Sequence, residues 1–127
     1  MSLERWQLGG TTVSLVAATE TATVLELVLV PGAGAGPHTH TREDETVVVL
    51  EGSLVVDDGE PRTLSAGEGH VLARGARHSF VNAGETAARA LFFCAPGGLE
   101  RFFREVAAAE SEPEAEAAAE RAGLTFD

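Results

Sequence analysis

Short apolar segments separated by turn-forming residues run through most of this chain, from Thr12 to Pro96. The segments are rich in Val, Leu and Thr, which favour β-strands, and no helical period runs between them. Roughly seven or eight short strands at near-regular spacing predict an all-β sandwich or small barrel. We expect a hairpin turn at Asp58-Gly59 and strands at Thr12–Ala18, Thr23–Val30, Thr46–Glu51, Leu54–Val56, His70–Ala73, His78–Asn82 and Ala87–Ala95.

The pattern changes after the Pro-Gly-Gly sequence at positions 96–98. Apolar residues then recur at i, i+3, i+4 and i+7, which predicts one apolar helical face, made of Leu99, Phe102, Phe103 and Val106. Ser111 and Glu114 have the spacing of a capping box, and Gly123 is a typical helix stop. The sequence therefore predicts a second helix that ends at about Ala122.

The length of 127 residues fits a single domain. We expect residues 1–98 to form the β-barrel and residues 99–127 to form a helical tail that packs on it within the same domain. The hydrophobic fraction of 44% is ordinary for a globular protein with a core of its own. The single cysteine, Cys94, excludes an intrachain disulfide framework.

The net charge of −11 limits the possible partners. It repels phosphate groups, so neither nucleic acid nor an anionic membrane is an expected partner. No apolar run approaches the roughly 20 residues that span a bilayer, and residues 1–6 do not resemble a signal peptide. The expected location is therefore the cytoplasm.

Four histidines, His38, His40, His70 and His78, carry the strongest chemical signal in the sequence. Two of them are spaced i, i+2, which places both rings on one face of an extended segment. Glu45 follows shortly afterwards. Imidazoles and a carboxylate are ligands that suit a divalent first-row metal.

A segment rich in glycine and proline, Pro31–Pro37, precedes the histidine pair. We expect it to be neither helix nor regular strand but a loop that delivers His38 to the sheet. Its alternating glycines do not predict a phosphate-binding loop, because such a loop leads into a helix, whereas here Pro37 and His38 follow.

Two spaced motifs give these residues a family resemblance. The first reads Gly32, five residues, His38-x-His40, four residues, Glu45, six residues, Gly52. The second reads Gly67, five residues, Ala73-x-Gly75, two residues, His78, three residues, Asn82. They resemble the two signatures of the cupin superfamily, which usually has Pro where this chain has Ala73. The sequence after Pro96 further resembles small single-domain, quercetin dioxygenase-like cupins.

The resemblance implies a double-stranded β-helix, or jelly-roll barrel, that holds a metal through three histidines and one glutamate. By position these ligands are His38, His40, Glu45 and His78. The implied cofactor is one divalent transition metal per chain, with iron, manganese, nickel, zinc and copper all open. Each ligating imidazole should give its second N–H to a carbonyl or carboxylate. Cupins also commonly pair, so we expect a homodimer.

Strand alternation predicts the surroundings of these ligands. Val47 and Val49 should share a face with Glu45, and Phe80 should share one with His78. The resulting apolar cup would suit a small hydrophobic or aromatic ligand. We expect His70 to be structural and Cys94 to be a buried hydrophobe. The charged residues expected at the rim of the site, outside direct contact with the metal, are Arg42, Glu43, Asp44 and Arg77.

Three classes of function fit this sequence. The favoured one is a metal-dependent oxygenase that acts on a small aromatic or enolic substrate, with Glu45 as a catalytic proton acceptor as well as a ligand. The second is a non-redox metalloenzyme, either an isomerase or a polyketide-type cyclase, whose metal polarises a carbonyl. The third is a non-catalytic module that binds a small molecule. The motifs do not choose among them.

Overall fold

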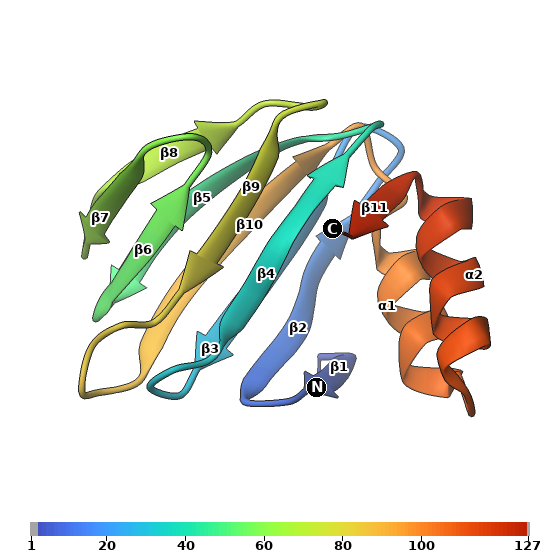
Figure 1. Ribbon diagram of the computed structural model, residues 1–127, viewed down its shortest axis with the longest axis horizontal. Coiled ribbons are helices and arrows are strands. Elements are labelled where there is room, and N and C mark those ends of the chain that lie inside the picture. Colours follow the sequence, from blue (N-terminus) through green and yellow to red (C-terminus); the bar gives the residue numbers. More distant parts are fainter. Residues whose placement is uncertain (1–2, 127) are drawn as a thin grey trace.

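The computed structural model describes residues 3–126 and folds them into two antiparallel β-sheets flanked at one side by two helices (Figure 1). The strand order is β1-β2-β3-β10-β5-β8 in the six-stranded sheet and β11-β4-β9-β6-β7 in the five-stranded sheet. The elements are β1 (Arg5–Leu8), β2 (Thr11–Ala18), β3 (Thr23–Leu29), β4 (Gly34–His40), β5 (Asp44–Glu51), β6 (Ser53–Asp57), β7 (Pro61–Ser65), β8 (Gly69–Leu72), β9 (Arg77–Val81), β10 (Ala88–Ala95), α1 (Glu100–Ala108), α2 (Glu112–Ala122) and β11 (Leu124–Phe126).

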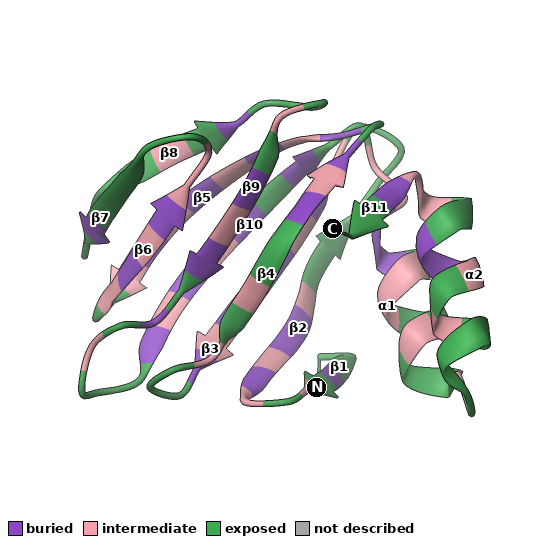
Figure 2. Ribbon diagram, viewed as in Figure 1, coloured by how far each residue is buried: buried purple, intermediate pink, exposed green. Residues whose placement is uncertain are grey.

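The core lies between the two sheets, where alternate residues of each strand point inward (Figure 2). In β3 every second residue is buried, from Thr23 to Leu29. Val47 and Val49 of β5 are fully buried, as are Leu54 of β6 and Ala90 of β10. This alternation is what two sheets packed face to face require, and it confirms the predicted all-β jelly roll with C-terminal helices.

Every strand predicted from the apolar runs is present, with ends within two residues of the prediction. The prediction missed β1, β7 and β11, which are short and carry no long apolar run. It was also wrong for part of the glycine-rich loop, since β4 already begins at Gly34. Here β4 approaches β9 so closely that a Cβ at Gly34 would overlap the carbonyl oxygen of Phe80. Glycine therefore permits the strand pairing at this position.

Helix α2 begins and ends as predicted, and α1 contains Phe102, Phe103 and Val106 of the predicted apolar face, with Leu99 at its N-cap. The hydroxyl of Ser111 accepts a hydrogen bond from the backbone N–H of Glu114 at 3.3 Å, which caps α2. Gly123 ends α2 in the left-handed conformation, with φ of 75°. The chain then returns to the sheet, and β11 pairs with β4, the strand that carries His38 and His40 (Figure 1). Neither helix is long and apolar enough to cross a membrane in the part of the chain described.

The first half of helix α1 is anchored to the barrel. At its start Leu99 is buried, and the buried carboxylate of Glu100 accepts a hydrogen bond from the hydroxyl of Thr23 at 2.9 Å. Further along, the ring of Phe103 stacks on Trp6 of β1, with ring centroids 5.6 Å apart. The helix therefore closes one side of the barrel.

Candidate metal centre

Three buried histidines from two neighbouring strands meet inside the barrel. His38 and His40 lie on β4, and His78 lies on β9 directly opposite His38 in the pairing of the two strands. One nitrogen from each ring lies within 4.8 Å of the others. The spacing of two residues in β4 thus places both rings on the inner face, as the sequence predicted. Together the three imidazoles could hold a metal ion.

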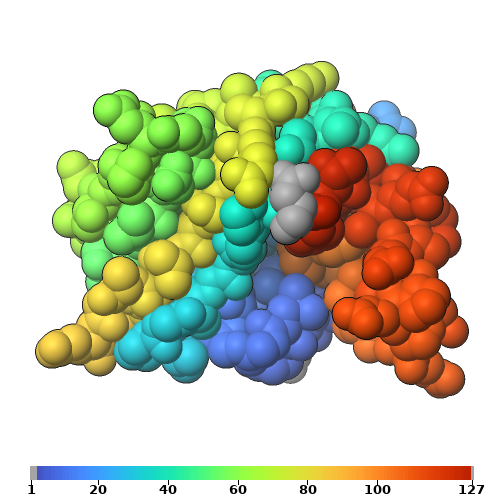
Figure 3. Space-filling view, viewed as in Figure 1, coloured from blue at the N-terminus to red at the C-terminus, as the bar shows by residue number. Residues whose placement is uncertain are grey.

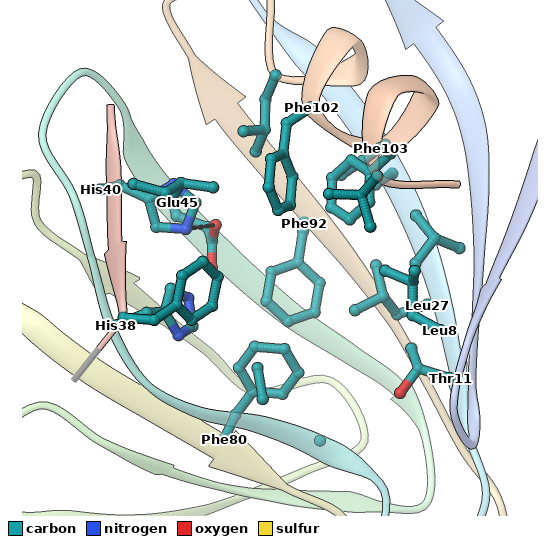
Figure 4. A pocket seen from close by; sticks show the side chains of 18 residues that line it. Leu8, Thr11, Leu27, His38, His40, Glu45, Phe80, Phe92, Phe102 and Phe103 are labelled. Carbon is teal, nitrogen blue, oxygen red and sulfur yellow. Dashed lines mark ion pairs between the residues drawn. The ribbon is translucent and has the colours of Figure 1, made fainter. Parts of the chain in front are cut away.

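Glu45 on β5 points toward the same histidines (Figure 4). Its Oε2 lies 3.1 Å from Nε2 of His40, and its Oε1 lies 3.7 Å from Nε2 of His78. The side chain is buried and reaches the cluster from the opposite sheet. The four residues implied as ligands by the sequence resemblance therefore converge on one point.

The outer nitrogens of two histidines face backbone carbonyls. Nδ1 of His38 lies 2.7 Å from the carbonyl oxygen of Gly36, and Nδ1 of His78 lies 3.2 Å from that of Ala76. A proton on each Nδ1 donates to the carbonyl two residues back, which leaves the lone pair on Nε2. Nε2 of His78 is buried and makes no hydrogen bond within the described structure. An orphaned acceptor nitrogen beside a carboxylate fits a divalent cation.

Burial also sets the protonation states of these groups. Burial, followed by the neighbouring His38 and His40, lowers the pKa of His78 to about 4. Burial lowers the pKa of His38 as well. It raises the pKa of the Glu45 carboxyl, against the opposing effect of His40. The imidazoles of His38 and His78 are therefore neutral, and able to bind a metal, near pH 7.

The cluster opens onto an apolar pocket of about 280 Å³. Figure 4 shows His38, His40 and Glu45 on one side of the pocket, facing Phe80, Phe92, Phe102 and Phe103. Among the described residues that line it, the polar side chains are the two histidines, Glu45 and Thr11, and none is an arginine. In the space-filling view the surface is recessed between the blue N-terminal strands and the orange C-terminal helices (Figure 3).

The predicted alternation holds around the ligands, because Val47 and Val49 are buried on the same face of β5 as Glu45, and Phe80 is buried on the same face of β9 as His78. Of these three neighbours only Phe80 lines the pocket, whereas Val47 and Val49 lie in the core. Leu8, Phe102 and Phe126 also line it, although nothing in the sequence singled them out as neighbours of the histidines. They come from β1, α1 and β11, which only the tertiary fold brings together.

Glu43 is not at the rim, where the sequence analysis placed it. Its side chain is buried, and its Oε1 lies 3.4 Å from Nδ1 of His40. Arg42 and Arg77 are exposed, as predicted for rim residues. The carboxylate of Asp44 accepts a hydrogen bond from the backbone N–H of Arg74 at 2.9 Å and another from its guanidinium, which together lower the pKa of Asp44.

The remaining histidine and the cysteine have different surroundings. Nε2 of His70 lies 2.8 Å from Oδ2 of Asp58, a pair that lowers the pKa of Asp58 and fits a structural role. Cys94 is fully buried, as predicted, and its Sγ lies 3.8 Å from Oε2 of Glu45. Burial, followed by the charge of Glu45, raises the pKa of the Cys94 thiol. The thiol therefore stays protonated and donates weakly toward Glu45.

Comparison with known proteins agrees with this geometry. Residues 25–94 match the family model described as the cupin domain. No curated protein sequence matches the chain. The fold is similar to that of KdgF from a Halomonas species, with a TM-score of 0.70 and 25% identity over 79% of this chain and 98% of that one.

Two further structures are similar to this chain. One is described as a sugar phosphate isomerase of the cupin superfamily from Silicibacter pomeroyi, with a TM-score of 0.66 and 27% identity over 74% of this chain and 71% of that one. The other is an oxalate oxidase, with a TM-score of 0.61 and 26% identity over 76% of this chain and 59% of that one. With more than half of its length matched by the family model, this chain belongs to the cupin family.

Proposed function

We propose that this cupin is a metal-dependent oxygenase that acts on a small aromatic or enolic molecule. It binds one divalent transition metal through His38, His40, Glu45 and His78. The observation that carries the proposal is the position of His38, His40 and Glu45 at one end of a pocket whose other walls are apolar except for Thr11, with His78 paired directly opposite His38. A donor set of this kind beside an apolar cavity suits a ligand with one oxygen-bearing edge and a hydrophobic body.

The residues of the chain would divide the work between them. The four ligands fix the metal, which supplies Lewis-acid or one-electron chemistry when bound. The phenylalanines enclose the body of the substrate and exclude water. Glu45 is buried at the edge of the pocket, where its carboxylate could take up a proton from a hydroxyl of the substrate.

The pocket also limits the charge of the substrate. The sequence has nine arginines and no lysine, so arginine is the only permanently cationic side chain available. None of the described residues that line the pocket is an arginine. Away from the proposed metal, an anionic group such as the phosphate of a sugar phosphate would have no cationic side chain to pair with inside the cavity, and burying an unpaired charge is costly. The body of the proposed substrate, beyond the edge that would face the metal, is therefore uncharged, unlike the sugar phosphate in the name of one similar enzyme.

A non-redox reaction is the second candidate. The similarity to the sugar phosphate isomerase favours it, because isomerisation requires only a polarised carbonyl and a base, the role proposed for Glu45. A non-catalytic module that binds a small molecule is the third. Homodimer formation and a cytoplasmic location stay predictions.

Ligand binding can be followed through Trp6, the single tryptophan of the chain. Trp6 stacks on Phe103, which lines the pocket, so occupancy should change its fluorescence. Catechol, a neutral aromatic diol, should bind and change the emission, whereas phthalate, which carries two carboxylates on the same ring, should not. Equal binding of both compounds would contradict an uncharged substrate.

Turnover separates the three classes of function. Iron-, manganese-, nickel- or copper-loaded protein should consume oxygen in the presence of a neutral aromatic diol or enol from a substrate panel. The Glu45→Gln variant should lose this activity. If none of the loaded forms consumes oxygen while binding is retained, the oxygenase proposal is wrong and an isomerase or a binding module takes its place.

A further inference from the structure

His40 lies between two buried carboxylates. Its Nε2 is 3.1 Å from Oε2 of Glu45, and its Nδ1 is 3.4 Å from Oε1 of Glu43. The Glu43 and His40 side chains are each only 6% exposed. Neither Nδ1 of His40 nor Oε1 of Glu43 makes a hydrogen bond within the described structure, either to the other atom or to a third residue. Each of these two atoms is therefore the natural partner of the other.

His40 differs in this respect from the other two histidines. His38 and His78 each face a backbone carbonyl with Nδ1, at positions fixed by their own strands. Nδ1 of His40 instead faces a side chain three residues further along, in the segment between β4 and β5. A carboxylate is a stronger acceptor than a carbonyl, and it makes the opposite ring nitrogen more basic.

The two carboxylates compete for one proton on the neutral ring. A proton on Nε2 donates to Glu45 and blocks the nitrogen that faces the metal site. A proton on Nδ1 donates to Glu43 and leaves Nε2 with a lone pair that points into the cluster. The tautomer that can bind a metal is therefore the one with its proton on Nδ1, which donates a hydrogen bond to Glu43.

We propose that Glu43 is a positioning residue that holds His40 in its metal-binding tautomer by accepting the proton on Nδ1. This proposal rests on the proposed metal site, although its first consequence, the tautomer of His40, exists without metal. The two atoms are 3.4 Å apart, slightly beyond the usual N–H···O distance of about 2.7–3.2 Å, so the proposed hydrogen bond requires the two side chains to move closer together. The role is distinct from ligation, because Glu43 faces the far side of the ring.

The surroundings of Glu43 suit a buried carboxylate. It lines a second cavity of about 280 Å³, between α1, α2 and the loop after β4. Three arginines line the same cavity, Arg42, Arg101 and Arg121, of which Arg121 also pairs with Glu105 at 3.3 Å. Three arginines and a second carboxylate, Glu105, therefore border the same cavity as Glu43.

Two substitutions at position 43 and one control test the proposal. Glu43→Leu removes the acceptor, Glu43→Gln keeps an acceptor oxygen, and Asp44→Asn alters the neighbouring carboxylate that pairs with Arg74. Zinc affinity is measured by competition with a chromophoric chelator. We expect Glu43→Leu to weaken zinc binding by about 10–100-fold. Glu43→Gln should recover most of the affinity, and Asp44→Asn should match the wild type.

Nitrogen-15 spectra of the histidine rings provide a readout that a purely structural role would not change. In metal-free protein, Glu43→Leu should shift the His40 ring toward the tautomer protonated at Nε2. The rings of His38 and His78 should keep their tautomers, because their backbone acceptors are unchanged. Zinc-loaded wild type should carry the His40 proton on Nδ1.

Two results would overturn the proposal. One is zinc affinity of a folded Glu43→Leu variant that equals that of the wild type. The other is an unchanged His40 tautomer in the metal-free variant. If the wild type fails to bind zinc or any other divalent metal, the proposed function is wrong, and the metal-free spectra still decide whether Glu43 sets the tautomer of His40.

Discussion

The aromatic ring of Phe126 stacks on the imidazole of His38, with ring centroids 5.5 Å apart and planes inclined by 26°. The two residues are directly paired where β11 joins the edge of β4. Phe126 also lies 6.5 Å from the ring of Phe102 on α1. Phe126 thus joins the histidine cluster to the aromatic wall of the pocket.

This contact predicts that Phe126→Ala weakens ligand binding more than it weakens the fold. The side chain is 58% exposed, so its loss should change the free energy of unfolding by less than about 1 kcal/mol. Catechol affinity, followed by Trp6 fluorescence, should fall by about two- to tenfold, which corresponds to one aromatic contact. The exposed Val16 on β2, which does not line the pocket, provides Val16→Ala as a control. Unchanged affinity in Phe126→Ala would show that β11 does not contribute to binding.

The anchor of α1 predicts a stability effect away from the pocket. The hydroxyl of Thr23 is fully buried, donates to Glu100 and accepts from the backbone N–H of Gly98 at 3.1 Å. Thr23→Val keeps the shape of the side chain but leaves Glu100 and the N–H of Gly98 without their hydrogen bonds. Urea unfolding should therefore show that the free energy of unfolding falls by about 1–3 kcal/mol. Thr12→Val, which removes an exposed hydrogen bond to Gln7, should cost much less. Equal effects of the two substitutions would contradict a structural role for the buried network.

The buried histidines predict how the stability of the metal-free protein depends on pH. The pKa of His78 is about 4 in the folded protein, against about 6.5 when unfolded, so between these values the unfolded chain binds more protons. Acidification from pH 6.5 to pH 4 should therefore remove up to about 3 kcal/mol of stability through His78 alone. His38 acts in the same direction, because its pKa is also lowered.

Glu45 has the opposite effect, because its pKa is raised in the folded protein. Its contribution to stability grows as the pH falls toward its unfolded value. The Glu45→Gln variant should therefore lose more stability than the wild type over the same acidification, and His78→Asn should lose less. Urea unfolding at pH 7 and at about pH 4.5 measures both differences. If the stability of the wild type and of both variants stays constant over this range, the buried histidines are not held neutral by the fold, and the prediction is wrong.

Only part of the ligand cluster could be predicted from local sequence. An i, i+2 pair of histidines in an extended segment has one geometrical outcome, with both rings on the same face. Glu45 and His78 were assigned to the cluster through the resemblance of the two motifs to the cupin signatures. The register that makes His38 and His78 direct neighbours is visible only in the structure.

The surroundings of the cluster could not be predicted in the same way. Glu43 lies between β4 and β5, outside the alternation of a strand, so the sequence pattern does not show whether its side chain points to solvent or to His40. The start of β4 was interpreted as a loop because its glycines suit turns, whereas Gly34 serves close strand packing. The pocket wall combines Leu8, Phe102 and Phe126, which lie far apart in the sequence and meet only through tertiary contacts.

The most direct test of the account is the metal content of purified, metal-loaded protein after removal of unbound ions. We predict one divalent metal per chain in the wild type, and loss of most of it in His78→Ala with the β-sheet circular dichroism signal retained. His70→Ala, which changes the histidine paired with Asp58, should keep the full metal content. A wild type without stoichiometric metal, or His78→Ala that keeps it, would contradict the proposed metal site.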